Sequence, residues 1–146
     1  MINDIQFVIT NWKQSKQELK QIRTDVFINE QHVPVELEWD EFDEQSIHFL
    51  ALYNNKAIAT ARLKPDGQIG RMAVTKEQRN KGVGTQLLTE ILLQARKNGY
   101  NMVYLHAQKK AIGFYERFNF IKNGAEFIDA GIAHRAMYKL LINNKD

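Results

Sequence analysis

The stretch Thr75–Thr85, which reads TKEQRNKGVGT, decides how the rest of this sequence is interpreted. It follows a strand-like run that ends at Val74 and leads into a segment with apolar residues at helical spacing. Gly82 and Gly84 therefore stand where a helix begins. A helix N-terminus presents unpaired backbone N–H groups and a partial positive charge, and glycine lets an anion approach the backbone closely. The stretch predicts a cradle for a phosphate or pyrophosphate, with a turn that happens to contain two glycines as the alternative.

Two other phosphate-binding motifs can be tested against the same residues. A P-loop requires Gly-x-x-x-x-Gly-Lys-Ser/Thr, which the chain lacks. A dinucleotide fingerprint requires a third glycine and an acidic residue about 20 positions further on. Leu87 occupies the third glycine position, and Tyr104 and Leu105 stand near the acidic one. Both motifs are therefore excluded.

The segments on either side predict an α+β fold. Strand-like runs at 47–53, 57–63 and 68–74 are joined by short turns, which is typical of an antiparallel meander. The helix that follows spans residues 83–95, and Gly99 is placed to cap it. Further strands are expected at 5–9 and 102–107 and as a pair within 120–142, with helices near 19–27 and 111–118. We expect one three-layer domain over residues 1–146, with a mixed, mostly antiparallel central sheet flanked by helices.

The segment 29–46 has no clear period and carries many acids. Seven of the 17 Asp and Glu residues lie between Glu30 and Glu44, a stretch without Lys or Arg. Such asymmetry favours an acidic approach surface for a cationic substrate, and a solvated acidic loop is the alternative.

Composition excludes several classes of protein. The net charge of +3 is small and no basic stripe is present, so a nucleic-acid-binding domain has only the pI near 9.1 in its favour. There is no cysteine, which excludes disulfides and a cysteine nucleophile. The four histidines lack zinc-site spacing, so we expect no metal. No signal peptide or membrane span is evident, and we expect a cytoplasmic protein.

Two motifs resemble a known family. Arg79-x-x-Gly82-x-Gly84 is similar to the Arg/Gln-x-x-Gly-x-Gly/Ala signature of the GNAT superfamily of N-acetyltransferases, and it directly follows a strand, as in that family. Downstream, Gln108-x-x-Ala111-x-x-x-Tyr115 resembles the family's Asn-x-x-Ala-x-x-x-Tyr, with Gln in place of Asn. The resemblance implies the GNAT acyl-CoA N-acyltransferase fold. It also implies contacts to coenzyme A from Met72, Ala73 and Val74 (pantetheine arm), from Arg79, Asn80, Lys81, Gly82, Val83, Gly84 and Thr85 (pyrophosphate), and from Gln108, Ala111 and Phe114.

A narrower resemblance covers almost the whole chain and points to the bacterial ElaA-type branch, in which Gln108 is the expected residue. The matching segments are Val26-Phe27-x-x-Glu30-Gln31, Asp40-x-x-Asp43, His48, Ala61-Arg62-Leu63, Ile69-Gly70-Arg71, Ala107-Gln108, Phe114-Tyr115-Glu116 and Gly131-Ile132-x-His134.

The reaction that the resemblance implies is direct transfer of an acetyl group from acetyl-coenzyme A to an amine. Tyr115 is the candidate general acid for the departing sulfur, and a core aromatic is the alternative. An alkyl ammonium has a pKa of about 10, so a base must remove a proton. Glu30, Asp43 and His134 are the candidates, and each could instead be an ordinary surface or satisfied polar group. A strand that splays from its neighbour beside Met72 would supply a backbone donor to the oxyanion.

The acceptor and the assembly stay open at this stage. The acidic segment favours a cationic small-molecule or peptide amine, such as a polyamine, a lysine side chain or an aminosugar. A non-catalytic acyl-coenzyme A sensor would keep the glycine loop without needing Tyr115 or a base. The sequence does not determine whether the chain forms a homodimer, and we expect no nucleic-acid or membrane partner.

Overall fold

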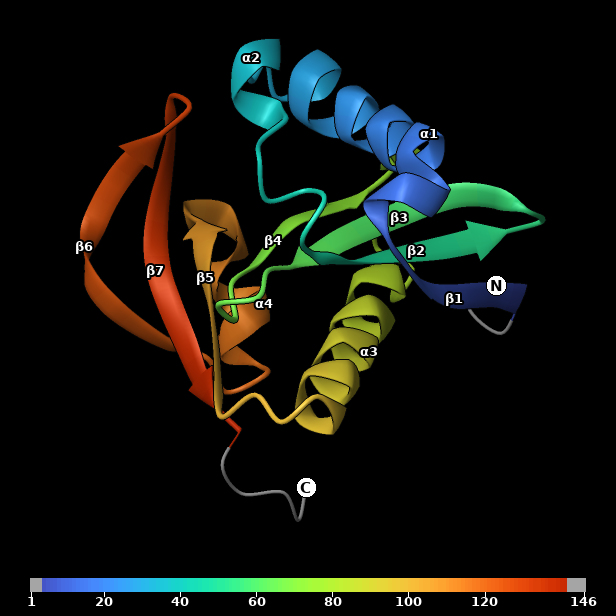
Figure 1. The fold of residues 1–146 in the computed structure, drawn as a ribbon. Coiled ribbons are helices and arrows are strands. Elements are labelled where there is room, and N and C mark those ends of the chain that lie inside the picture. Colours follow the sequence, from blue (N-terminus) through green and yellow to red (C-terminus); the bar gives the residue numbers. More distant parts are fainter. Residues whose placement is uncertain (1–3, 142–146) are drawn as a thin grey trace.

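The chain folds into two antiparallel sheets that lie side by side, with helices on both faces of the larger one (Figure 1). The computed structural model describes residues 4–141. The larger sheet has the order β1-β2-β3-β4, formed by β1 (Ile5–Thr10), β2 (Ile47–Tyr53), β3 (Lys56–Leu63) and β4 (Ile69–Val74). The smaller sheet has the order β5-β7-β6, formed by β5 (Met102–Gln108), β7 (Ile132–Leu140) and β6 (Ile121–Asp129).

The helical elements lie between the strands in the order that the sequence predicts. They are α1 (Trp12–Arg23), the π-helical segment η2 (Thr24–Glu30), α2 (Val35–Glu38), the short 3-10 turn η3 (Lys76–Gln78), α3 (Val83–Lys97), the 3-10 turn η4 (Lys109–Ala111) and α4 (Ile112–Glu116). The α+β class and the antiparallel meander are confirmed. Ile142, the expected end of the last strand, lies outside the described residues.

Side chains along the strands of the larger sheet alternate between its two faces, and each face has its own hydrophobic core. Residues such as Phe49 and Ala51 point to the face covered by α3, where Leu87, Leu88 and Ile91 are buried. Leu50, one position away on β2, points to the other face and packs with the buried residues of α1. Because successive strand side chains face opposite sides, one sheet separates the two helices into three layers, as Figure 1 shows.

The central sheet is divided, where the sequence suggested a single one. β4 and β5 meet only at an isolated parallel bridge, in which the Tyr104 N–H donates to the carbonyl of Gly67 at 3.1 Å. On its other edge β5 pairs with β7 along its whole length, from Met102 to Gln108. The register between β3 and β4 also shifts next to Arg71, which has a left-handed φ of 49°. A bulge of this kind bends the strand and increases its twist, so β4 diverges from β5.

The long helix α3 begins and ends as its sequence predicts. Gly82 has a φ of 85° and brings the chain into the helix at Val83. At the other end Gly99 has a φ of 82°, its N–H donates to the carbonyl of Arg96, and the N–H of Tyr100 donates to that of Ala95. These two bonds form a Schellman motif, which needs a residue tolerant of the left-handed conformation.

The acidic segment after η2 is anchored by a buried group of ion pairs, here called the ion cluster. Three acids of the segment meet three arginines from α1, β3 and β4: Glu38, Asp40, Asp43, Arg23, Arg62 and Arg71. Arg23 is fully buried, and its guanidinium lies 2.9 Å from Glu38 and 2.8 Å from Asp43. Three of the seven acids expected to form an acidic surface are therefore paired with arginines, with Glu38 and Asp43 buried and Asp40 at the exposed edge of the cluster.

None of the helices within residues 4–141 combines the length and the apolar composition that a bilayer crossing requires.

Candidate active site

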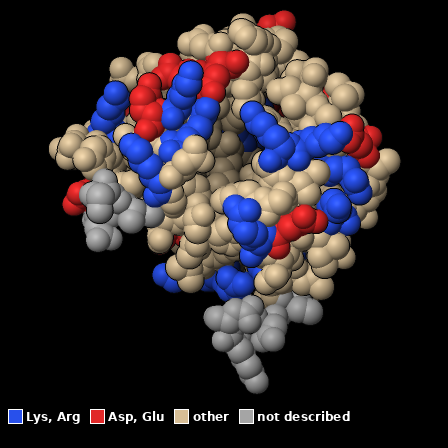
Figure 2. All heavy atoms as spheres, turned by 180° about the vertical axis from the view of Figure 1, so that it is seen from behind, with Lys and Arg blue, Asp and Glu red and all other residues tan. Residues whose placement is uncertain are grey.

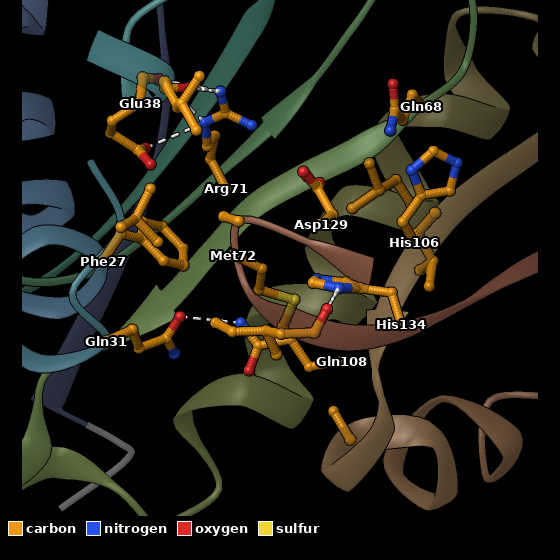
Figure 3. Close-up of a pocket in the computed structure, with 18 of the residues that line it drawn as sticks. Phe27, Gln31, Glu38, Gln68, Arg71, Met72, His106, Gln108, Asp129 and His134 are labelled. Carbon is orange, nitrogen blue, oxygen red and sulfur yellow. Dashed lines mark hydrogen bonds and ion pairs between the residues drawn. The ribbon is translucent and has the colours of Figure 1, made fainter. Parts of the chain in front are cut away.

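A cavity of about 290 Å³ opens where β4 and β5 diverge, and Figure 3 shows the side chains around it. Five of the predicted catalytic or cofactor-binding residues line it: Met72 on β4, Gln108 at the end of β5, Ala111 and Tyr115 around α4, and His134 on β7. The remaining walls come from the end of η2, the α2 region and the β6–β7 hairpin. Elements that are far apart in the sequence therefore converge on one space.

The strand β4 has one free edge beside the cavity. Ala73 and Val74 pair with Thr60 and Ala59 of β3. On the other side, within residues 4–141, β4 has no strand partner past the bridge at Gln68. Backbone N–H and C=O groups along this edge can therefore pair with an extended ligand, as a further strand would.

The amino end of α3 lies next to this edge. No side chain within the described residues caps the helix at Gly82, so the amides of its first turn have no partner from the helix itself. A Cβ added to Gly84 would lie 3.7 Å from the ring of Phe114 and 4.0 Å from the Met72 methyl carbon. The glycine loop, the strand and α4 are thus in contact, and the two sequence motifs form one site.

The Arg79 guanidinium has a role that its sequence position did not indicate. It forms a bidentate ion pair with Glu30, with Nη2 lying 2.7 Å from Oε1, and its Nε donates to the Val74 carbonyl at 2.9 Å. Arg79 therefore joins the end of β4 to the end of η2. These contacts occupy the Arg79 side chain in the structure, and a contact between Arg79 and the pyrophosphate stays a prediction.

Glu30 is removed from the candidate bases by the same contact. The hydrogen bond from Arg79 lowers the pKa of Glu30, which keeps the carboxylate ionised and makes it a weak proton acceptor. Glu30 also lies away from the cavity, in a separate groove of about 880 Å³ between the first helices and the β2–β3 hairpin.

Asp43 is also removed from the candidate bases, because it is paired with arginines. It is 2% exposed and lies in the ion cluster, outside the cavity lining. Burial alone would raise the pKa of Asp43, but the hydrogen bonds and charges of Arg23 and Arg62 outweigh it and lower the pKa. Its backbone carbonyl also accepts a hydrogen bond from His48 Nε2 at 2.8 Å. Asp43 thus holds the acidic segment in place.

His134 is the candidate base that the fold brings into the cavity. Its Nδ1 lies 2.7 Å from the Ile132 carbonyl. A carbonyl can only accept, so Nδ1 carries the hydrogen and the neutral ring keeps its lone pair on Nε2. The ring stacks on Phe127 with 5.7 Å between centroids and projects into the cavity in Figure 3.

Tyr115 lies beside β4 in a largely apolar setting. Its hydroxyl is 3.7 Å from the Met72 sulfur, and its ring makes edge contacts with Phe114 and Phe120 at 5.1 Å and 5.9 Å between centroids. Burial raises the pKa of Tyr115 to about 12, so the phenol keeps its proton at neutral pH. The hydroxyl can therefore act as a hydrogen-bond donor.

Three further cavity residues were missed as site residues. Gln31 accepts a hydrogen bond from Gln108 at 2.8 Å and so links η2 to the end of β5. His106 on β5 and Asp129 at the end of β6 also line the cavity. His106 stands two positions before Gln108, so it shares that residue's strand face. This period-2 signal could have identified it.

The face opposite to that of Figure 1 is basic around a hollow. Figure 2 shows Lys and Arg side chains grouped on both sides of a depression near the middle of this face. Such an arrangement attracts an anionic ligand. Within residues 4–141, no group of three or more His, Asp or Glu side chains is arranged to hold a metal ion.

Comparison with known proteins gives a consistent result. A family model described as the acetyltransferase (GNAT) domain matches residues 13–141. The chain is 33% identical over 132 residues to protein ElaA of Escherichia coli K12, covering 85% of this chain and 86% of ElaA. It is 33% identical over 122 residues to the uncharacterized N-acetyltransferase YjcF of Bacillus subtilis 168, covering 81% of this chain and 87% of YjcF.

Solved structures show the same architecture. The crystal structure of Escherichia coli ElaA superposes with a TM-score of 0.84 at 28% identity and covers 92% of this chain and 99% of ElaA. An acyl-CoA N-acyltransferase from Pseudomonas aeruginosa also has a TM-score of 0.84, at 26% identity and with the same coverage of 92% and 99%.

Proposed function

Because the chain belongs to the GNAT acetyltransferase family, in its ElaA-like branch, we propose that it transfers the acetyl group of acetyl-coenzyme A directly to an amine bound in the cavity. The protein is an N-acetyltransferase with the fold of the acyl-CoA N-acyltransferases. The proposal adds the choice of acetyl-coenzyme A and direct attack within a ternary complex. Residues 1–146 form the single catalytic domain in this proposal, and the reaction uses no metal.

One observation carries the proposal. Met72, Tyr115 and His134, which come from three separate parts of the sequence, line one cavity beside the uncapped amino end of α3. In this assignment the free edge of β4, from Met72 to Val74, pairs with the pantetheine arm. The amides of the segment from Asn80 to Thr85 hold the pyrophosphate, and Gln108, Ala111 and Phe114 complete the thioester end of the site.

His134 acts as the base in this proposal. An alkyl amine with a pKa of about 10 enters mostly as an ammonium, and the Nε2 lone pair accepts its proton. The neutral nitrogen then attacks the thioester carbonyl carbon, a C–N bond forms, and the carbonyl oxygen gains negative charge. In this proposal a backbone N–H on the free edge of β4, next to Met72, stabilises that charge.

Tyr115 stabilises the leaving sulfur. The C–S bond breaks and its electron pair stays on sulfur, which departs as a thiolate whose conjugate thiol has a pKa of about 8.5 by analogy with cysteine. The nitrogen still carries one proton more than the product amide, and this proton passes to the thiolate, directly or through solvent, so that the amide and the free thiol are released. A phenol with a pKa of about 12 does not transfer its proton fully to such a thiolate, so the hydroxyl contributes a hydrogen bond. The general-acid role expected from the sequence is therefore refined to that of a donor.

A two-step experiment tests the function. Thermal unfolding is recorded with and without acetyl-coenzyme A, and thiol release is then measured across a panel of small-molecule and peptide amines. A ligand at about 100 times its Kd adds about 2.7 kcal/mol to the free energy of unfolding, so the midpoint should rise measurably. We expect a rise together with amine-dependent thiol release. A rise with no release on any amine would identify a sensor, and the absence of a rise would reject the proposed cofactor site.

A further inference from the structure

Asp129 carries the one unbalanced charge among the described residues at the cavity. The cations nearby are already paired: Arg71 lies 3.0 Å from Glu38 and 3.2 Å from Asp40, as part of the ion cluster. Lys64 lies 3.7 Å from Asp66 at the outer rim. Asp129 has neither an ion pair nor a side-chain hydrogen bond within residues 4–141, and Figure 3 shows its carboxylate in the cavity between Arg71 and His106.

The wall next to Asp129 is aromatic, and the attraction of the Asp129 charge for a proton on His106 is outweighed by burial of that ring. Phe127 packs edge-on against His106 at 5.2 Å and stacks on His134, so three rings stand side by side. Burial lowers the pKa of His106, which leaves this imidazole neutral at pH 7. A carboxylate beside neutral ring faces attracts a cation, because both the charge and the ring quadrupole favour it.

The β6–β7 hairpin brings this charge and the proposed base to one face of the smaller sheet. Phe127 pairs with His134 and Asp129 pairs with Ile132, so Asp129 and His134 are diagonal neighbours on one face. The backbone positions of diagonal neighbours in an antiparallel pair are about 7–8 Å apart. An extended chain advances roughly 1.2 Å per covalent bond, so a short chain of about six bonds is comparable in length to this backbone separation.

We propose that the natural acceptor carries two amino groups joined by a short chain, with one reacting beside His134 and the other held as an ammonium by Asp129. This inference rests on the proposed function and names the substrate class of the same cavity. It also moves the source of cation selectivity from the acidic segment, in which Glu30, Glu38, Asp40 and Asp43 are paired with arginines, to the β6–β7 hairpin.

Steady-state kinetics test the inference with a matched pair of amines. Cadaverine has two amino groups six bonds apart, and pentylamine has the same carbon chain with one. We expect wild type to have a higher kcat/KM for cadaverine, and Asp129→Asn to lower the ratio of the two kcat/KM values about fivefold, the upper end for an exposed ion pair. Asp129→Glu keeps the charge, so the ratio of kcat/KM for cadaverine to that for pentylamine should stay close to the wild-type value. Glu126→Gln removes an exposed carboxylate of the same hairpin and should leave the ratio unchanged.

A binding measurement keeps this inference separate from the proposed function. Cadaverine is titrated calorimetrically into wild type and Asp129→Asn, both saturated with coenzyme A so that no transfer occurs. About fivefold weaker binding to the variant supports the inference even if no amine releases thiol, in which case only the proposed function fails. Equal affinities overturn the inference, as would an unchanged ratio in the kinetic comparison or an equal loss with Glu126→Gln.

Discussion

Tyr115→Phe is the substitution that tests the chemistry with the least disturbance to the fold. The only hydrogen-bond partner of the hydroxyl within the described residues is the Met72 sulfur at 3.7 Å, which is a weak acceptor. The ring contacts with Phe114 and Phe120 remain in the variant. We therefore expect the free energy of unfolding to change by less than about 0.5 kcal/mol.

The expected loss of turnover follows from the charge on the leaving sulfur. A hydrogen bond to a charged group contributes about 1.5–3 kcal/mol, and each 1.36 kcal/mol in the barrier is about tenfold in rate. Removing the hydroxyl should thus lower kcat roughly 10- to 150-fold, while acetyl-coenzyme A binding stays the same. Thiol release measures kcat, and thermal unfolding with acetyl-coenzyme A measures binding.

Tyr104→Phe is the matched control. Burial and a 2.7 Å hydrogen bond to Asp66 raise the pKa of Tyr104 to about 12 as well, but its hydroxyl lies outside the cavity lining. We expect its kcat to equal that of wild type. The reasoning fails if Tyr115→Phe keeps wild-type turnover, or if both substitutions lower kcat to the same extent.

Further predictions concern the cradle and the ion cluster. Gly84→Asp should abolish the rise in unfolding temperature with acetyl-coenzyme A, because the new carboxylate repels the pyrophosphate. The fold should tolerate Gly84→Ala, because the added Cβ would lie at an ordinary contact distance of 3.7 Å from Phe114. A full rise in the Gly84→Asp variant would contradict the placement of the pyrophosphate. Asp43→Asn should lower the free energy of unfolding, measured with urea, by about 3 kcal/mol, because the buried Arg23 and Arg62 lose a negatively charged partner. A decrease of less than about 1 kcal/mol would count against this role of Asp43. The lowered pKa of Asp43 means that its contribution is complete above the unfolded value of about 3.9 and is lost as pH falls through the folded pKa. The gap between wild type and Asp43→Asn should accordingly narrow below about pH 4, and a constant gap would show that Asp43 does not titrate there.

Local patterns in the chain were sufficient for the elements and for one half of the site. Strand alternation, the two glycines before α3 and the cap at Gly99 each act within a few residues of themselves, so their geometry follows from steric and hydrogen-bonding rules that the sequence displays directly. The resemblance of the segments around Gly84 and Tyr115 to a known family also pointed to the correct fold.

The general base and the acceptor side depended on contacts between distant residues. Glu30, Asp43 and His134 were equivalent candidates because nothing near them in the sequence tells a paired carboxylate from a free one. Arg79 reaches Glu30 across 49 positions, and Arg62 reaches Asp43 across 19. Those pairings occupy two of the three candidates and leave His134.

The strand–loop–helix unit around Gly82 and Gly84 follows from the local sequence, because backbone conformation and amide exposure there are local properties. Which charges are neutralised and which face the cavity depends on contacts made in the folded protein. The acids of the 30–44 segment look alike in sequence, yet Glu38, Asp40 and Asp43 are paired with arginines, while Asp129, at the end of β6, is left without a partner in the described structure. The reason is physical: the effect of a charge depends on burial and on neighbours within a few ångströms, and folding chooses those neighbours from the whole chain.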